Sequence, residues 1–483
     1  MRVDKAKTFR LIVTAGFAIA GCAPTTGLAV HAKDSGATSL DLAPERDLSS
    51  DQSLGERDAA ASVEVAIADT FPQTPDLGQD IATPDTVTNK DAGVDSPVVP
   101  KDSASEPVAQ DVAADGGGAL ACTGTPAFGI WPLTDTGTTY PTGNFPISVA
   151  LGDLNGDGTL DIVSANQDSD TASVLLGKGD GSFASNVDYP TGSQPTAVVM
   201  GDLSGDGRLD LAVMHDQSVS VLLGKGDGSL AANVDYPAGS QLTAIALGDL
   251  NGDGKLDIVV TNAVGPSGTA IVLLGTGGGM FAGNLAYQVG IYPNGVALGD
   301  LNGDGKSDIV VANTGADGYW SASVLLGKGD GTFAAKVDYD TGHGPSAVRL
   351  GDLNGDGNLD IIMSSSIYLN NVDTVTVLLG KGDGTFAAKV EYGTGVSPNS
   401  VALGDFNGDG WLDVVTSNFG DSPQSGGVSL LLGKGDGTFA TKLDYLVADP
   451  PSSIAVGDLN DDGWLDIVTT GGNSVDVLLG SCR

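Results

Sequence analysis

The sequence is poor in cations, histidine, aromatics and cysteine. Its 483 residues contain 22 Lys and Arg against 61 Asp and Glu, which gives a formal net charge of −39. Nucleic acids and anionic membrane surfaces are bound through clustered cations, so this balance argues against both as partners. Only three histidines are present, which leaves few places for His-dependent catalysis. Glycine, in contrast, is abundant: 72 residues are about twice the average usage.

The amino terminus has the composition of a bacterial export signal. Four basic residues within the first ten precede a short apolar run, 11–19, which is too short to span a bilayer comfortably. The run ends in Ile19-Ala20-Gly21-Cys22, which resembles the lipobox of bacterial lipoproteins. The resemblance implies cleavage before Cys22 and firm anchoring by acyl chains on that cysteine. Ala23, rather than Asp, after the cysteine favours the outer membrane or cell surface. The alternative is an ordinary secretory signal with an incidental cysteine.

Residues 23–120 are predicted to form a disordered acidic linker. Their net charge is −13, and Phe71 is the one aromatic residue. Such a segment cannot bury enough apolar surface to offset the entropy lost on ordering. We therefore expect three parts: a lipoprotein signal peptide at 1–22, a tether at 23–120 that holds a domain away from the membrane, and that domain at 121–483.

From residue 121 onward the chain repeats one unit seven times. An element of the form VALGDLNGDGxLDIVV recurs at spacings of 47 to 53 residues. A second element, VLLGKGDGTF, follows it in six units and is shortened in the last. Periods of this length indicate stacked or radial repeat architectures. The first Asp of the repeated element is Asp153, Asp202, Asp249, Asp300, Asp352, Asp405 and Asp458.

Each unit is predicted to contain four short strands, so the fold class is all-β. In the first unit these are 148–151, 160–164, 173–176 and 183–189, with a Gly-Asp-Gly turn before the last. Four strands in each of seven units indicate a seven-bladed β-propeller. A solenoid would need polar capping repeats at its ends, and the sequence has none.

The two ends of the domain complement each other. The stretch 128–140 resembles a fourth strand without the three that should precede it, and the last unit stops after its third strand at Gly480. We expect the amino-terminal strand to complete the last blade and so remove an open sheet edge. Cys122 and Cys482 would both lie in this shared blade. We predict a disulfide between them in an oxidising compartment; two free thiols are the alternative.

The repeated element contains an acidic loop, Asp-x-Asn-x-Asp-Gly-x-x-Asp. Oxygens at positions 1, 3 and 5 with a glycine at 6 are how a short loop wraps Ca²⁺, and the Asp at position 9 would complete the cage. Position 12 is apolar or small, so an EF-hand is excluded. The predicted ligands are Asp153, Asn155, Asp157, Asp161; Asp202, Ser204, Asp206, Asp210; Asp249, Asn251, Asp253, Asp257; Asp300, Asn302, Asp304, Asp308; Asp352, Asn354, Asp356, Asp360; Asp405, Asn407, Asp409, Asp413; and Asp458, Asn460, Asp462, Asp466.

The kind of acid separates metal binding from general acidity. After residue 120, every acidic residue but Glu391 is Asp, whereas a merely solubilising surface would use both acids. Asp can also cap turns through backbone amides, which suits the Gly-Asp-Gly turns. It suits the loops poorly, because three converging carboxylates repel one another without a cation. We expect up to seven structural Ca²⁺ ions, with the loop of Ser204 the weakest.

These repeats resemble the FG-GAP/VCBS repeats of integrin α-subunit heads and of integrin-like bacterial propellers. The resemblance covers residues 128–480 and implies a seven-bladed propeller with calcium between the first two strands of a blade. Relatives are adhesion modules, lectins or accessory domains. We therefore expect a monomeric, cell-surface binding or adhesion module whose ligand is an extracellular protein or polysaccharide. A calcium-containing lectin is the alternative, and a polysaccharide hydrolase or lyase a weaker one, since two carboxylates suffice for that chemistry.

Ligand contacts are expected on the face opposite the acidic loops. The connections between second and third strands vary most in length there, and variable loops on a rigid scaffold usually carry binding. Candidate contacts in the long connections are Tyr319, Trp320 and Tyr368. Trp411 and Trp464 lie in acidic loops on the other face, where packing is the expected role. No catalytic residue is predicted.

Overall fold

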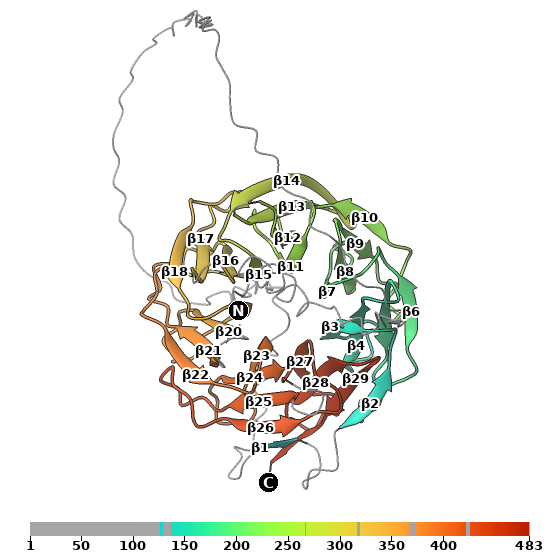
Figure 1. Cartoon of the computed structure of the whole chain (residues 1–483). Helices are drawn as coiled ribbons and strands as arrows, with labels where there is room; N and C mark the ends of the chain where they lie inside the picture. The colour runs from blue at the N-terminus through green and yellow to red at the C-terminus, as the bar shows by residue number, and fades with distance from the viewer. Residues whose placement is uncertain are drawn as a thin grey trace, which may run out of the picture. The chain divides into compact units, whose positions relative to one another are not determined.

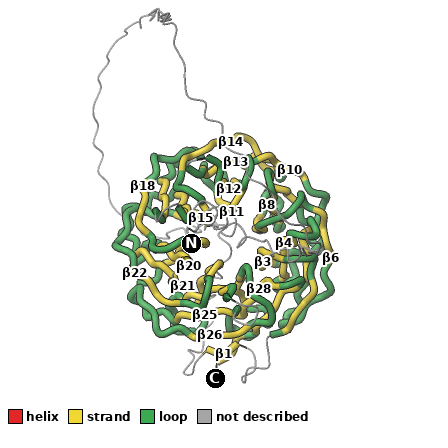
Figure 2. Tube along the Cα trace, viewed as in Figure 1, coloured by secondary structure: helices red, strands yellow, loops and turns green. Residues whose placement is uncertain are grey.

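The domain is a seven-bladed β-propeller, as the sequence predicted. Seven four-stranded antiparallel sheets surround a central axis (Figure 1), and the described residues contain no helix (Figure 2). No helix in that part of the chain is therefore long and apolar enough to cross a membrane. The structure is a computed structural model that describes residues 126–128, 137–265, 267–315, 319–367, 372–421 and 426–482.

Six blades take their four strands in chain order, from the central axis outward. Blade 1 is β3 (Pro146–Gly152), β4 (Asp161–Asn166), β5 (Thr171–Leu175) and β6 (Val187–Pro190); blade 2 is β7 (Ala197–Gly201), β8 (Asp210–His215), β9 (Ser218–Leu222) and β10 (Val234–Pro237); blade 3 is β11 (Leu242–Gly248), β12 (Asp257–Asn262), β13 (Thr269–Gly277) and β14 (Met280–Gln288). Blade 4 is β15 (Pro293–Gly299), β16 (Asp308–Asn313), β17 (Ser321–Leu325) and β18 (Val337–Asp340); blade 5 is β19 (Pro345–Gly351), β20 (Asp360–Ile367), β21 (Val372–Leu378) and β22 (Val390–Gly393); blade 6 is β23 (Pro398–Gly404), β24 (Asp413–Asn418), β25 (Gly427–Leu431) and β26 (Leu443–Leu446).

Blade 7 is built from both ends of the domain. Its inner strands are β27 (Ile454–Gly457), β28 (Asp466–Gly471) and β29 (Ser474–Leu478), and its outer strand is β2 (Thr138–Pro141), which pairs antiparallel with β29. The predicted ring closure is therefore confirmed. A second pair, β1 (Pro126–Phe128) with β30 (Gly480–Cys482), stands where other blades have a tight turn.

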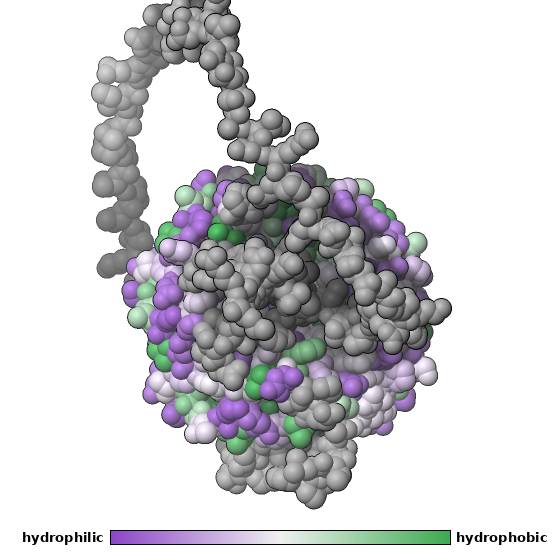
Figure 3. Space-filling model, in the orientation of Figure 1, coloured by the Kyte–Doolittle hydropathy of each residue, from purple (hydrophilic) through white to green (hydrophobic). Residues whose placement is uncertain are grey.

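Burial follows from this layered arrangement. All six residues of β4 and all six of β16 are buried, because the second strand of a blade is covered by neighbouring blades on both faces. Both strands therefore lack the polar–apolar alternation of a half-buried strand: at least two apolar residues follow the first Asp directly. The outer strands are mostly exposed, and polar and apolar residues are mixed over the face seen in Figure 3.

Adjacent blades are joined by a repeated tyrosine–phenylalanine contact. Tyr392 of β22 meets the ring of Phe439 in blade 6 edge-on, with centroids 5.0 Å apart, and donates a hydrogen bond to the carbonyl of Gly437 at 3.3 Å. Edge-to-face pairs of this kind add about 0.5–1.5 kcal/mol beyond burial. Blade 2 has Leu230 at the phenylalanine position, so its contact with Tyr189 of blade 1 lacks a second ring.

The fourth strands are shorter than predicted. In blade 1 the strand begins at Val187 rather than at Phe183, which makes an isolated bridge with Gly177. Blade 3 is the exception, because β13 and β14 are nine residues each. They are joined through Gly278 and Gly279, both with positive φ (65° and 71°), a conformation that glycine adopts without steric cost.

Several sequence predictions fall outside the described residues. These are the signal peptide at 1–22 with its lipidation at Cys22, the linker at 23–120, and Cys122. The backbone of Cys482 lies opposite Pro126, four residues after Cys122 in the chain. The disulfide stays a prediction.

Candidate functional site

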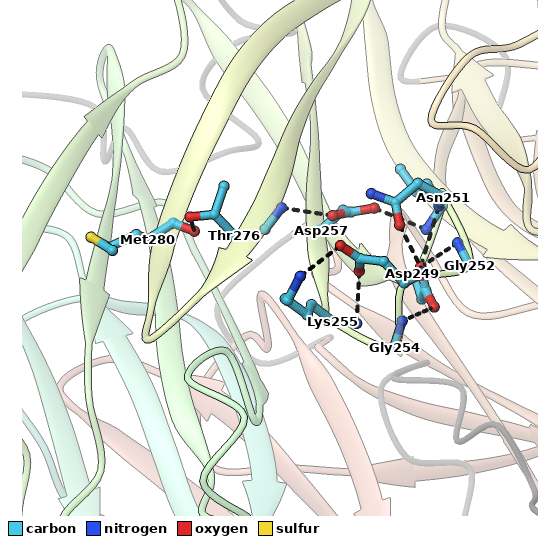
Figure 4. A network of polar contacts seen from close by, with 11 residues as sticks. Asp249, Asn251, Gly252, Gly254, Lys255, Asp257, Thr276 and Met280 are labelled. Atoms are coloured by element: carbon cyan, nitrogen blue, oxygen red, sulfur yellow. Dashed lines mark hydrogen bonds and ion pairs between the residues drawn. The ribbon is translucent and has the colours of Figure 1, made fainter.

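The acidic loops connect the first and second strands of each blade, and the loop of blade 3 shows their geometry (Figure 4). Asp249 at position 1 accepts hydrogen bonds from the backbone amides of Gly252 and Gly254, both at 2.8 Å. Asn251 at position 3 accepts one from the amide of Asp253 at 2.9 Å. The first and third side chains thus hold the backbone of the loop in a tight turn through its own amides.

The Asp at position 9 has a different setting. Both carboxylate oxygens of Asp257 accept backbone amides: Leu250 N at 2.9 Å from its own loop, and Gly275 N at 2.7 Å from the end of β13. The side chain thereby ties the acidic loop to the third strand, a structural role that sequence analysis did not assign. The position-9 side chains are 0% exposed in all seven blades: Asp161, Asp210, Asp257, Asp308, Asp360, Asp413 and Asp466.

This burial perturbs the carboxyl groups. The pKa of Asp257 is raised to about 6. Desolvation is the largest cause and the neighbouring carboxylates of Asp249 and Asp253 add to it, while the hydrogen bonds from the two amides act in the opposite direction. The same causes raise the pKa of Asp413 and of Asp466 to about 7. The loops therefore concentrate negative charge that a bound cation would offset.

The donor set of the loops fits a hard cation. Carboxylate, side-chain amide and backbone carbonyl oxygens are the ligands that Ca²⁺ takes, whereas transition metals favour nitrogen and sulfur. Among the described residues, no group of three or more His, Cys, Asp or Glu side chains is arranged to hold a metal ion. A calcium ion would therefore also need the amide oxygen of position 3 and backbone carbonyls. The seven calcium sites stay a prediction.

The Gly-Lys-Gly-Asp-Gly turns lie on the same face and connect neighbouring blades. In blade 1, Asp180 accepts hydrogen bonds from the amide and hydroxyl of Ser182, the expected turn cap. Gly181 donates its amide to the carbonyl of Leu459 in the acidic loop of blade 7, at 3.1 Å. The Trp411 ring lies against the backbone of Gly355 and Gly435. It is a packing residue, as expected, although 39% exposed.

The opposite face carries a repeated backbone feature that sequence analysis missed. A residue directly before the first strand of a blade, or three residues before it in blade 2, has a positive φ of 51–56° in six blades, although only one of the six is glycine. In five of these blades its carbonyl accepts an amide from the end of the second strand or the loop after it, as Tyr292 does from Thr314 at 2.9 Å. Aligning the links between blades could have shown this position. The residues are Phe145, Gln194, Gln241, Tyr292, Gly344 and Ser397.

Two predicted ligand contacts lie together on that face. The side chain of Tyr319 is 80% exposed. Its neighbour Trp320 contacts His343, with ring centroids 4.7 Å apart and an interplanar angle of 47°. No feature of the sequence indicated that His343 lies beside Trp320. Tyr368 lies outside the described residues.

His215 belongs to a structural network rather than to a catalytic triad. Ser220 donates to Asp235 at 2.5 Å, and His215 Nε2 lies 3.6 Å from the same carboxylate. The serine hydroxyl is thus bound to the acid and not to the histidine. In blade 1 the same positions hold Asn166 and Ser173, so His215 replaces a buried asparagine of the scaffold.

Comparison with known proteins identifies the repeat. The family model described as FG-GAP-like repeat matches residues 153–213, 202–260, 300–363, 366–416 and 419–469, which together exceed half of the chain. Residues 261–299, which include the unusual hairpin of β13 and β14, lie outside these ranges. Comparison with curated proteins gave no match.

Solved structures with similar folds include BBS1N in complex with ARL6DN (15% identity, 71% of this chain and 94% of that chain covered, TM-score 0.48). Another is an Agrocybe aegerita lectin that recognises non-reducing terminal N-acetylglucosamine (18%, 73% and 87%, 0.44). A third is the V. cholerae biofilm matrix protein Bap1 (12%, 71% and 88%, 0.40). Likenesses at this level carry no information about a ligand. The family match and the seven-bladed architecture together establish that this chain belongs to the FG-GAP-like repeat family.

Proposed function

We propose that the protein is a calcium-stabilised binding and adhesion module of the bacterial cell surface, whose ligand is an extracellular protein or polysaccharide. The FG-GAP propeller is typically a binding or adhesion fold rather than an enzyme. The supporting observation is the contrast between the two faces. One is a nearly uniform set of acidic loops and turns, and the other presents connections of different lengths and chemistry on an interlocked ring.

Calcium would stabilise the ring rather than contact the ligand. The acidic loops occur in every blade and are joined to the turns of neighbouring blades, so an ion in each loop would strengthen the interface between blades. The residues proposed to hold it are those at positions 1, 3, 5 and 9 of each loop. The position-9 carboxylate would act mainly by fixing the loop, because both of its oxygens already accept amides.

The anchor is proposed from the sequence alone. Acylation at Cys22 would fix the protein to the envelope, most simply to the outer membrane, and residues 23–120 would separate the propeller from the bilayer. Cys22→Ala should abolish incorporation of an alkyne-labelled fatty acid and shift the protein from the membrane to the soluble fraction. Equal labelling and membrane retention in both proteins would contradict the anchor.

Adhesion is tested with the full chain displayed on a Gram-negative host. Cells that carry the chain should be retained on immobilised extracellular matrix more strongly than vector-only cells. Treating the matrix with periodate removes polysaccharide ligands, and treating it with protease removes protein ligands, so the two arms distinguish the ligand classes. Retention no greater than that of vector-only cells would refute the proposed function.

A further inference from the structure

We propose that described residues from three segments form one binding site for an uncharged glycan: two from the start of blade 4, three from between β16 and β17, and one from the link after β18. This site, called the blade 4 platform, consists of Tyr292, Asn294, Thr314, Tyr319, Trp320 and His343. The inference rests on the proposed binding function and specifies the ligand class.

Hydrogen bonds hold the first two segments of the blade 4 platform together. Thr314 donates its amide to the carbonyl of Tyr292 at 2.9 Å, and Gly315 donates to that of Ile291 at 2.8 Å. The side-chain amide of Asn294, at the exposed second position of β15, donates to the hydroxyl of Thr314. The backbone of Tyr292, the side-chain amide of Asn294 and the hydroxyl of Thr314 are thus fixed relative to one another.

The third segment is joined through the same connection. Thr314 donates its hydroxyl to the carbonyl of Pro345 at 3.0 Å, and the ring of Trp320 contacts that of His343. Within the described part of the chain, the buried Nδ1 of His343 has no hydrogen-bond partner. A buried polar atom without a partner is uncommon and points to a group that the described residues do not supply.

Two residues with positive φ, Gly315 and Tyr292, fix the backbone of the blade 4 platform. Gly315 has a φ of 67°, and a Cβ there would lie 1.8 Å from the carbonyl oxygen of Tyr319, so only glycine fits. Tyr292 adopts a φ of 51°, which is unfavourable for a bulky residue and persists only where surrounding contacts impose it. Residues held in this way are preorganised for binding.

The chemistry of the platform favours sugars. A tyrosine ring that is 80% exposed contributes little to packing, but it offers an apolar face to the CH groups of a pyranose. The side-chain amide oxygen of Asn294 can accept a hydrogen bond from a sugar hydroxyl group, whereas the hydroxyl of Thr314 is already used within the platform and serves to position Asn294. None of the six side chains is a carboxylate, lysine or arginine, and the acidic domain around them repels anionic polymers. Neutral hexose or N-acetylhexosamine chains therefore fit better than uronate chains.

The test measures binding of the full chain, in detergent and millimolar calcium, to cellohexaose, maltohexaose, mannohexaose and chitohexaose, with polygalacturonate as the anionic counterpart. Saturable binding to at least one neutral probe is expected. Tyr319→Ala and Trp320→Ala should each weaken it about tenfold or more, as truncation of a central aromatic contact does. Tyr319→Phe should keep it, because the ring remains. Trp411→Ala removes an exposed aromatic from the other face and should leave the affinity unchanged.

The melting temperature of each variant is measured alongside, so that a folding defect is not read as lost binding. If the melting temperature of Trp320→Ala is lower than that of the wild type, the affinity of Tyr319→Ala becomes the deciding measurement, because the exposed side chain of Tyr319 can be removed without leaving a cavity in the core. Binding to no neutral probe, stronger binding to polygalacturonate, unchanged affinity in Tyr319→Ala, or an equal loss in Trp411→Ala would each overturn the inference. Matrix adhesion without neutral-glycan binding would overturn this site alone; loss of both would overturn the proposed function as well.

Discussion

Chelation of calcium should lower the melting temperature of this propeller by tens of degrees. A ligand at 100 times its Kd stabilises the folded state by about 2.7 kcal/mol per site. The unfolding entropy of a domain of roughly 350 residues is about 0.7 kcal/mol per kelvin, so each ion is worth about 4 °C and seven about 25 °C. The assay is a calorimetric or fluorescence melt of the full chain in millimolar calcium and again in excess chelator.

One substitution isolates a single site. Asp253→Asn keeps an oxygen that can accept the amide of Lys255, at 3.0 Å, and removes one carboxylate of the blade 3 loop. It also removes the Lys255 ion pair, but both partners are about 40% exposed, so that pair is worth about 0.5 kcal/mol or less. The variant should melt up to about 4 °C lower than the wild type in calcium and within about 1 °C of it in chelator.

The matched control is Asp227→Asn. Asp227 lies in the turn of blade 2 and accepts the amide of Ser229 at 2.9 Å, so this change also removes one carboxylate and keeps the turn cap. Its calcium response should equal that of the wild type. Superimposable wild-type melts with and without calcium would refute the metal assignment, and an equal loss in both variants would show a general charge effect instead.

The remaining predictions concern pH, blade contacts and closure. Without calcium, burial raises the pKa of every position-9 carboxyl, to about 6 at Asp257 and about 7 at Asp413, against about 3.9 unfolded. The folded state therefore binds more protons than the unfolded state, and its stability should fall as the pH rises from about 4 to 7, measured by urea unfolding in chelator. Phe439→Leu should destabilise by about 1–2 kcal/mol through the lost ring contact, seen as a lower melting temperature, whereas Leu230→Phe should be neutral or stabilising if Tyr189 accepts it as a partner. Mass spectrometry should find Cys122 and Cys482 linked, and Cys482→Ser should destabilise by about 2–4 kcal/mol; two free thiols in the wild type would contradict this.

The repeats were sufficient to predict the architecture. The spacing of the acidic loops gave the number of blades, because each loop needs one hairpin and each hairpin one sheet. Closure followed from unmatched strands at the two ends, and β2 pairs with β29 as that reasoning required. The fourth strand was predicted too long because it was started at Phe183, a strand-forming residue that makes only an isolated bridge. Ala184 and Asn186, which follow it, are residues that strands disfavour.

The functional residues were only partly predictable. Exposed aromatics in variable connections marked Tyr319 and Trp320, but the residues beside them come from links between blades and are distant in sequence. No local pattern places His343 against Trp320, since that contact depends on how two blades pack. The second role of the position-9 carboxylate was missed for a similar reason, because its partner Gly275 lies a strand away.

The shared seventh blade determines how the protein would bear a mechanical load. The chain reaches the propeller at β1 and then β2. The first residue of β2, Thr138, pairs with Val477 near the carboxyl end of β29, which is the end on the acidic-loop face. A pull from the amino terminus would therefore arrive on the acidic-loop face, and a ligand bound on the opposite face, as proposed above, would resist it. Hydrogen bonds between antiparallel strands lie across the strand axis, so tension along β2 shears its pairs together instead of opening them one by one. The strand that closes the ring would thus carry the load once the β1–β30 pair has given way, whereas a disulfide between Cys122 and Cys482 would pass the load to the carboxy-terminal strands first.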